Sequence, residues 1–239
     1  MKYKYILFDA DDTLLDFGKA EWFALNKTLE DIKFNCNKYI AEKFSSICDK
    51  LWHEFKLDEP LNRYVQINYH DLYYKYSVER FKDLKELLDI NISAQLLSEK
   101  YLNSFSECGF LVKGAENVCK QLSLQYKIFV VTNGLSHVQK SRIGNSKIKS
   151  YITDILISED AGCAKPGKEF FDYSIKSLGT SNLSEMLIVG DSIITDIFGG
   201  NEYGIDTCLF NSKRKINKLK IQPKFEIREL NELLGILRI

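Results

Sequence analysis

Three aspartates, Asp9, Asp11 and Asp12, lie within four residues where the apolar segment "YKYILFD" ends. A carboxylate at such a place can act as a nucleophile toward phosphorus and form an aspartyl-phosphate that water then hydrolyses. The alternative is a solvated acidic turn, because aspartate is favoured in turns and helix caps. Polar residues elsewhere in the chain help to decide between these two interpretations.

Residues that could serve such a reaction also follow three later apolar segments. They form a T-N-G turn, a K-P pair and a G-D step, in this order along the chain: Thr132-Asn133-Gly134, Lys165-Pro166, and Gly190-Asp191 with Asp196. Each signal is weak alone, since such short patterns also arise by chance. Their order and their common position after apolar segments argue against unrelated structural features.

The apolar segments themselves are predicted to be buried strands. Each is a short continuous apolar run, and helical stretches separate them: residues 3–9, 126–133, 152–158, 185–191 and 206–211. Continuous apolar strands that alternate with helices are typical of a parallel sheet covered on both faces, so we predict a doubly wound α/β core. Ligands bind beyond the carboxyl ends of the strands in such sheets, and the candidate residues are expected to meet there.

The segment 17–108 differs from the rest of the chain. Its apolar residues recur with helical spacing, as in "AEWFALNKTLEDI" and "ERFKDLKELL". We predict a helical cap domain, 17–108, inserted into an α/β core made of residues 1–16 and 109–239. Within the cap, the tyrosines of the aromatic segment 63–81 are predicted to pack between helices, and stacking on a flat substrate ring is the alternative.

Composition and charge indicate a globular protein without a polyanionic partner. The 239 residues are 45% apolar and 28% charged, and Lys+Arg equals Asp+Glu at 33 each. A net charge of zero gives no overall attraction to nucleic acid or to anionic membranes, so neither a nucleic acid polymer nor a membrane is expected as a partner. The main basic run, residues 213–220, is predicted to be a surface loop.

The six cysteines form no CxxC pair, and the three histidines are dispersed, so zinc-type spacing is absent from the sequence. No secretory segment is expected before the first strand. Reduced thiols in the cytoplasm are therefore the simplest prediction.

The four polar signals, with a helical insertion between the first and the second, resemble the motifs of haloacid dehalogenase (HAD) superfamily phosphatases. The resemblance spans essentially the whole chain. Four stretches are particularly similar to the pyrimidine 5′-nucleotidase branch: "FDADDTLLDF", "VVTNG", "ISEDAGCAKPGKEFFDYSI" and "VGDSIITDIFGGNEYGIDT". This resemblance implies the α/β core of the superfamily, an inserted helical cap of the C1 type and a small-molecule phosphate ester as substrate.

The resemblance also assigns roles to the candidate residues. It implies that Asp9 is the nucleophile and that Asp11 protonates the leaving alkoxide and then activates water. Thr132 and Asn133 would bind phosphate oxygens. Lys165 would neutralise the transferring phosphoryl group, which is a preorganised electrostatic role.

Mg²⁺ is the cofactor expected at this site. A phosphomonoester carries about −1.5 to −2 charges at neutral pH, and two like charges at about 4 Å repel by roughly 4 kcal/mol at an effective dielectric near 20. Anionic Asp9 therefore needs a divalent cation, and Mg²⁺ binds through carboxylates and substrate phosphate. The implied ligands are Asp9, Asp191 and the backbone carbonyl of Asp11, with Asp196 and Thr13 as supporting residues.

Three other classes of protein fit the motifs less well. An EF-hand needs glycine at its sixth position, where this chain has Leu14. A P-loop kinase needs GxxxxGK[ST], which "KPGKEF" lacks. Dehalogenases of the same superfamily generally lack the second aspartate, so Asp11 favours phosphate esters.

We predict a Mg²⁺-dependent phosphomonoester hydrolase that acts on pyrimidine nucleoside 5′-monophosphates. The alternatives are a small-metabolite phosphatase, acting on phosphoglycolate or a sugar phosphate, a phosphomutase, and a catalytically silent binding module. Two departures from the nucleotidase pattern concern the substrate. The segment "LWHEFKLDEPLNRY" replaces a glycine-containing turn, and Lys113 replaces a common proline.

Overall fold

A six-stranded parallel sheet forms the centre of the α/β part in the computed structural model, which describes residues 2–214 and 216–239. The strands lie in the order β3-β2-β1-β4-β5-β6. They are β1 (Tyr5–Phe8), β2 (Lys127–Thr132), β3 (Asp154–Ile157), β4 (Met186–Gly190), β5 (Asp206–Phe210) and β6 (Phe225–Ile227). The five predicted strands are all present. The sixth was not predicted, because three residues with an exposed glutamate in the middle give no apolar run.

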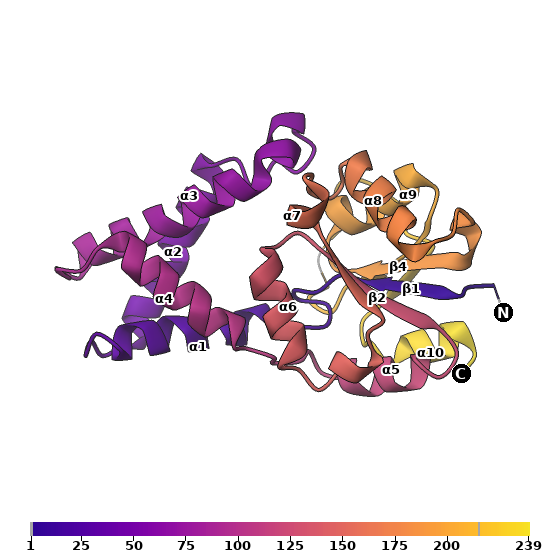
Figure 1. Ribbon diagram of the computed structural model, residues 1–239, viewed down its shortest axis with the longest axis horizontal. Coiled ribbons are helices and arrows are strands. Elements are labelled where there is room, and N and C mark those ends of the chain that lie inside the picture. The colour runs from indigo at the N-terminus through magenta and orange to yellow at the C-terminus, as the bar shows by residue number, and fades with distance from the viewer. Residues whose placement is uncertain (1, 215) are drawn as a thin grey trace.

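Helices cover both faces of the sheet, as predicted for a doubly wound core. Ile6 and Phe8 of β1 pack in one apolar cluster with α5 and α10, whereas Leu7 packs in another with α8. This alternation follows from the two-residue period of a strand. Figure 1 shows α5 and α10 on one side of the sheet and α8 and α9 on the other. These helices are α5 (Ala115–Leu122), α8 (Lys168–Leu178), α9 (Gly199–Tyr203) and α10 (Glu232–Leu237).

Short helical segments follow the carboxyl ends of three strands and so lie close to the predicted site. After β2 comes α6 (Ser136–Gly144), after β3 comes α7 (Ser158–Ala161), and after β4 comes the π-helical segment η3 (Ile193–Phe198). Two 3₁₀ turns complete the core: η1 (Lys149–Tyr151) and η2 (Leu183–Glu185).

Four helices lie between β1 and β2 and form the inserted helical part, on the left in Figure 1. They are α1 (Phe17–Glu30), α2 (Lys38–Glu54), α3 (Arg63–Leu87) and α4 (Ala94–Ser106). A side-chain oxygen caps the start of each one, which satisfies a backbone N–H that the helix leaves unpaired: Asp16, Asn37, Asn62 and Ser93. The division into a 17–108 cap domain and a core of 1–16 with 109–239 stays a prediction.

The helical part has its own apolar cluster. Tyr76 and Phe81 of α3 are buried in it, so this half of the aromatic segment packs between helices as predicted. Leu135, just before α6, and Val138, in its first turn, join the same cluster. The helical part is therefore packed against the core through α6.

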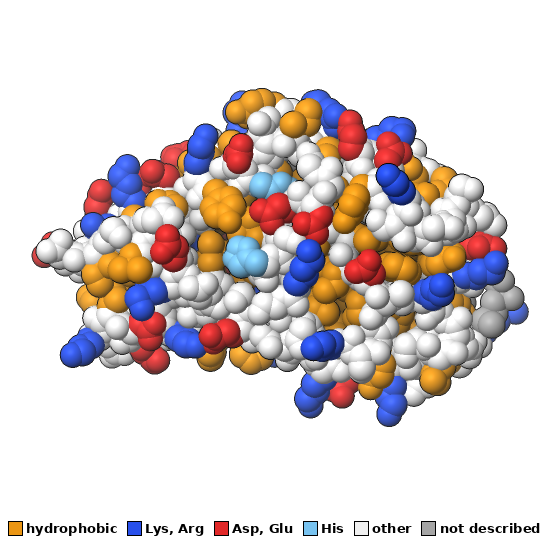
Figure 2. All heavy atoms as spheres, viewed as in Figure 1, with side chains coloured by type: hydrophobic (Ala, Val, Ile, Leu, Met, Phe, Trp, Pro, Cys, Tyr) orange, Lys and Arg blue, Asp and Glu red, His pale blue; other side chains and the backbone are white. Residues whose placement is uncertain are grey.

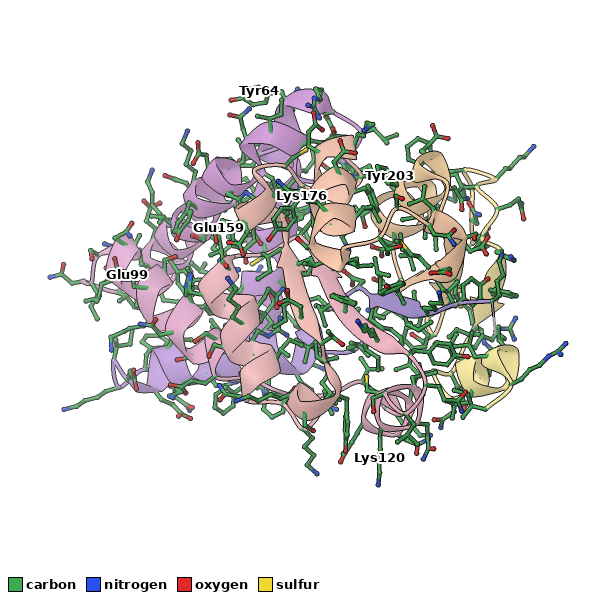
Figure 3. All side chains as sticks on the ribbon, turned by 45° about the vertical axis from the view of Figure 1, so that its right-hand side comes forward. Tyr64, Glu99, Lys120, Glu159, Lys176 and Tyr203 are labelled. Atoms are coloured by element: carbon green, nitrogen blue, oxygen red, sulfur yellow. The ribbon has the colours of Figure 1, made fainter. Side chains whose placement is uncertain are left out.

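A second contact between the two parts lies at the start of α3. Arg63 forms an ion pair with Glu169 of α8, and the carbonyl of Gln66 accepts a hydrogen bond from the backbone N–H of Ala164 at 2.9 Å. Figure 3 shows the start of α3, marked by Tyr64, beside α8. The helices therefore reach across the carboxyl ends of the strands.

Charges of both signs are interspersed over the face shown in Figure 2. The described residues of the basic run 213–220 lie in a mostly exposed segment without helix or strand, as predicted, and Lys215 lies outside the described residues. No helix in residues 2–214 and 216–239 combines the length and the apolar character that crossing a membrane requires.

Candidate active site

The aspartate loop begins where β1 ends. The backbone N–H of Asp9 still donates to Val189 of the neighbouring strand β4 at 2.8 Å, and the chain then turns, with the Leu14 N–H bonded to the Ala10 carbonyl at 2.9 Å. Asp12 adopts a left-handed conformation with a φ of 59°, which aspartate tolerates better than most residues. Its carboxylate forms an ion pair with Lys213. Asp12, for which the sequence suggested no role, is thus paired with a lysine of the basic run 213–220.

Lys165 lies at the centre of the site and is 2% exposed. Its Nζ donates to Asp9 Oδ1 at 2.8 Å, to Asp196 Oδ1 at 2.7 Å and to the carbonyl of Val131 at 2.8 Å. Burial alone would lower the pKa of Lys165, but the negative charges of Asp196 and Asp9 outweigh burial and raise it. Lys165 is therefore a charged ammonium that joins two segments far apart in the sequence.

Three carboxylates gather around this ammonium. Ligand oxygens of Asp9, Asp191 and Asp196 all lie within 4.8 Å of one another. Burial raises the pKa of Asp9 well above its ordinary range, the Lys165 charge opposes this, and the charges of Asp196 and Asp191 add to it. An all-oxygen donor set of this kind suits Mg²⁺.

Gly190 allows Asp196 to reach the cluster. A Cβ atom at position 190 would lie 2.2 Å from Asp196 Oδ2, which no real Cβ contact permits. The same Oδ2 accepts a hydrogen bond from the backbone N–H of Ser192 at 3.1 Å. The G-D step therefore contributes in two ways. Asp191 is the residue that follows Gly190, and the missing Cβ of Gly190 leaves space for the Asp196 carboxylate.

Thr132 and Asn133 lie beside Lys165 at the end of β2. The Asn133 side chain is bonded in both directions to the Lys165 backbone: its Nδ2 donates to the carbonyl at 3.0 Å, and its Oδ1 accepts from the N–H at 2.7 Å. The Thr132 hydroxyl accepts from Gln139 Nε2 at 3.2 Å. Asn133 thus fixes the loop that carries Lys165. A phosphate-binding role for either residue stays a prediction.

Asp11 faces α6 rather than the carboxylate cluster. Its Oδ2 accepts from Gln139 Nε2 at 2.8 Å, and its Oδ1 forms an ion pair with Arg142, a fully buried residue. Gln139 and Arg142 are three residues apart on one helix face, just after the T-N-G turn. The sequence analysis missed both. The only available signal was this pair of polar residues on a helix that follows a predicted strand end.

The described structure shows no contact of Thr13 that supports its predicted role beside the Mg²⁺ ligands. Its side chain is fully buried, its hydroxyl has no hydrogen-bond partner in the described structure, and it does not line the cavity at the site. The other predicted residues do line that cavity: Asp9, Asp11, Thr132, Asn133, Lys165, Asp191 and Asp196.

The cavity has a volume of about 330 Å³ and lies between the strand ends and the helical part. Trp52 of α2 and Tyr69 of α3 contribute to its wall from the helical side. The Asp9 carboxylate, the buried Lys165 ammonium and a candidate cation site thus share a cavity of the size that small ligands occupy.

A family model described as haloacid dehalogenase-like hydrolase matches residues 3–204. The chain is 35% identical over 238 residues to a protein named as a HAD-hydrolase, YfnB of Bacillus subtilis (strain 168), covering 100% of this chain and 97% of YfnB. A crystal structure of YfnB bound to magnesium superposes with a TM-score of 0.86 at 34% identity, covering 100% of both chains.

Two further relatives match over almost the whole chain. Pyrimidine 5′-nucleotidase YjjG of Escherichia coli (strain K12) is 28% identical over 237 residues, covering 99% of each chain. Pyrimidine 5′-nucleotidase PynA of Streptococcus pneumoniae (strain ATCC BAA-255 / R6) is 27% identical over 238 residues, covering 99% of this chain and 96% of PynA. With the aspartate loop, the buried lysine and the helical insertion in place, the chain belongs to the haloacid dehalogenase-like hydrolases.

Proposed function

We propose that the chain is a Mg²⁺-dependent phosphomonoester hydrolase whose substrates are pyrimidine nucleoside 5′-monophosphates. The observation that carries the chemistry is the buried Lys165 ammonium between Asp9 and Asp196, beside a third carboxylate. The substrate class is supported by the two relatives named as pyrimidine 5′-nucleotidases, which match this chain over nearly its whole length.

In the first step, a carboxylate oxygen of Asp9 attacks the phosphorus atom and the ester P–O bond breaks. The leaving alkoxide takes a proton from the protonated form of Asp11, which lines the same cavity. Lys165, at 2.8 Å from Asp9 Oδ1, is already in place to balance the charge of the phosphoryl group, so no reorganisation is needed at that moment.

In the second step, the oxygen of a water molecule attacks phosphorus, Asp11 accepts the water proton, and the bond between Asp9 and phosphorus breaks. Phosphate and the free carboxylate are regenerated. Asp9, Asp191 and the backbone carbonyl of Asp11 would hold Mg²⁺, and Asp196 would support them. When bound, Mg²⁺ supplies the positive charge that lets an anionic nucleophile approach an anionic ester.

The proposal places this reaction in the cytoplasm. All six cysteines are free thiols, and five of them are buried. A protein without disulfides is suited to a reducing compartment.

A substrate screen tests the proposal. Phosphate release is measured as kcat/KM for nucleoside 5′-monophosphates, sugar phosphates and phosphoglycolate, with Mg²⁺ and with EDTA. We expect the highest values for uridylate, deoxyuridylate or thymidylate, loss of activity with EDTA and recovery with added Mg²⁺.

The other outcomes identify the alternatives. Preference for phosphoglycolate or a sugar phosphate would show a small-metabolite phosphatase. Isomerisation of a sugar phosphate without release of phosphate would show a phosphomutase, and folded protein without any turnover would show a binding module.

A further inference from the structure

A second cavity, of about 410 Å³, adjoins the candidate active site beneath the helical part. The two cavities share four lining residues: Asp11, Trp52, Tyr69 and Asn133. An ester whose phosphorus lies at Asp9 would therefore direct its leaving group past Asp11 into this second space. Its volume is within the range of small-ligand sites.

Arg80 of α3 lines the second cavity and is 2% exposed. Its Nε and Nη2 atoms make no hydrogen bond, and no carboxylate of the described residues forms an ion pair with it within 4.0 Å. Buried charges are normally paired, because an unpaired one loses its hydration without compensation. Arg80 thus has two nitrogen donors, Nε and Nη2, that no group of the described residues uses.

Aromatic rings compensate part of the Arg80 charge. The guanidinium carbon lies 4.3 Å from the ring centroid of Tyr101 and 5.2 Å from that of Tyr76. Such contacts stabilise a cation, but they supply no acceptor for the N–H groups. A purely structural role for Arg80 is therefore the alternative that an experiment must exclude.

Aromatic and acidic side chains also line this cavity. Tyr69 and Tyr73 of α3 both line it, with their rings nearly parallel at an interplanar angle of 21° and 6.2 Å between centroids. Glu21 of α1 also lines it and offers a carboxyl group. The cavity therefore presents guanidinium donors, a carboxyl group and aromatic surface together.

We propose that this cavity holds the leaving group of the substrate, with Arg80 donating to a carbonyl oxygen and Glu21 accepting from the adjacent N–H of a flat heterocycle. The inference rests on the phosphatase function proposed above. Uracil and thymine present an N–H between two carbonyl oxygens, whereas cytosine presents an acceptor nitrogen in that place. The site therefore prefers uracil and thymine nucleotides to cytidylate.

The test compares two variants with matched controls. Arg80→Met keeps the length of the side chain and removes the donors, and Glu21→Gln keeps its shape and removes the charge. The controls are Arg228→Met and Glu99→Gln, both at exposed positions, and Figure 3 shows Glu99 at the outer end of the helical part.

The main readout is a ratio of kcat/KM values for two substrates, which does not depend on how much of a variant is folded. We expect Arg80→Met to lower the ratio of uridylate to phenyl phosphate by about 10- to 100-fold, as for loss of a hydrogen bond from a charged group. Glu21→Gln should lower the ratio of uridylate to cytidylate by about 10-fold. The controls should stay within about twofold. An equal loss for both substrates in Arg80→Met would show a structural residue and overturn the inference.

Calorimetric binding of uridine, which has no phosphate, separates this inference from the proposed function. If wild-type protein binds uridine and Arg80→Met weakens binding about 10-fold, the cavity holds the base even if no ester is hydrolysed. If wild-type protein hydrolyses phenyl phosphate but does not bind uridine, the phosphatase function stands and the proposed occupant is wrong. If it does neither, both proposals are wrong.

Discussion

Lys165 and Gly190 show how single residues determine this site. Lys165 contributes a charge that two carboxylates share, and Gly190 contributes only the absence of a side chain. A buried ammonium needs carboxylate partners, because a buried charge without any partner is costly. Gly190 acts on the same cluster, since its missing Cβ is what lets Asp196 lie beside Lys165.

Gly190→Ala is expected to reduce kcat/KM by at least about 100-fold, in line with misplacing one group of a preorganised site. The added methyl group would lie 2.2 Å from Asp196 Oδ2 and would push that carboxylate away from Lys165. The matched control is Gly144→Ala, where a Cβ meets nothing within 4 Å. Steady-state kinetics at saturating Mg²⁺ makes the comparison, and equal activity of the two variants would contradict the role given to Asp196.

Among single residues, the sequence predicted the members of the carboxylate–lysine cluster better than the residues that line the neighbouring cavity. Asp9, Lys165, Asp191 and Asp196 lie together as expected, because each follows a strand of one parallel sheet. Arg80 was not predicted as a site residue. A charged residue on a helix looks exposed until the facing helix is known, and neither its burial nor its missing partners can be read from spacing.

Helix α6 connects the sheet to the helical part and orients Asp11. The backbone N–H of Ser136, at its start, donates to Glu159 Oε2 of α7 at 2.6 Å, and Figure 3 marks Glu159. Gln139 and Arg142 then bond to the two oxygens of Asp11. The strand β2, which supplies Thr132, thus leads into the helix that sets the direction of the Asp11 carboxylate.

Gln139→Leu should lower kcat about 10-fold and change KM less than threefold, because Asp11 loses one of two hydrogen-bonded partners that position it. The matched control is Gln95→Leu on the exposed surface of α4, which should stay within about twofold. Initial rates with uridylate provide both parameters. An unchanged kcat in Gln139→Leu would mean that α6 does not position Asp11.

The strands were the elements that the sequence predicted best. Each buried strand of a parallel sheet is a continuous apolar run, and five such runs became β1 to β5. The packing of the helical part on α6 was not predicted, because Leu135 and Val138 are ordinary apolar residues whose partners come from a distant part of the chain.

Across the whole molecule, charge pairs tie distant segments together. Asp206, at the start of β5, contacts Lys2 and Tyr3 from the beginning of the chain and Lys224 just before β6. Burial alone would raise the pKa of Asp206, but the hydrogen bonds from Lys2, Lys224 and Tyr3 outweigh burial and lower the pKa to about 2. This cluster therefore ties the start of β5 to the segments before β1 and β6 only while Asp206 is ionised.

Asp206→Asn should reduce the free energy of unfolding by about 1 kcal/mol at pH 7, a value discounted for the partial exposure of the cluster. The lowered pKa means that the stabilisation is complete above the unfolded-state value near 3.8 and is lost as the pH falls toward about 2. Urea unfolding at several pH values measures the difference from wild type. Glu42→Gln, in an exposed pair with Lys38, should cost less than about 0.5 kcal/mol. If Asp206→Asn lowered the free energy of unfolding equally at pH 7 and pH 2, the loss would come from the shape of the side chain rather than from its charge.

Asp9 as the nucleophile is tested most directly by finding the residue that carries the phosphoryl group during turnover. Protein with Mg²⁺ is mixed with the best substrate of the screen, quenched in acid within milliseconds, digested and analysed by mass spectrometry. We expect phosphate on Asp9 in the wild type, and neither phosphate nor turnover in Asp9→Asn, which should remain folded. Phosphate on another residue, or turnover by Asp9→Asn near the wild-type rate, would contradict the mechanism.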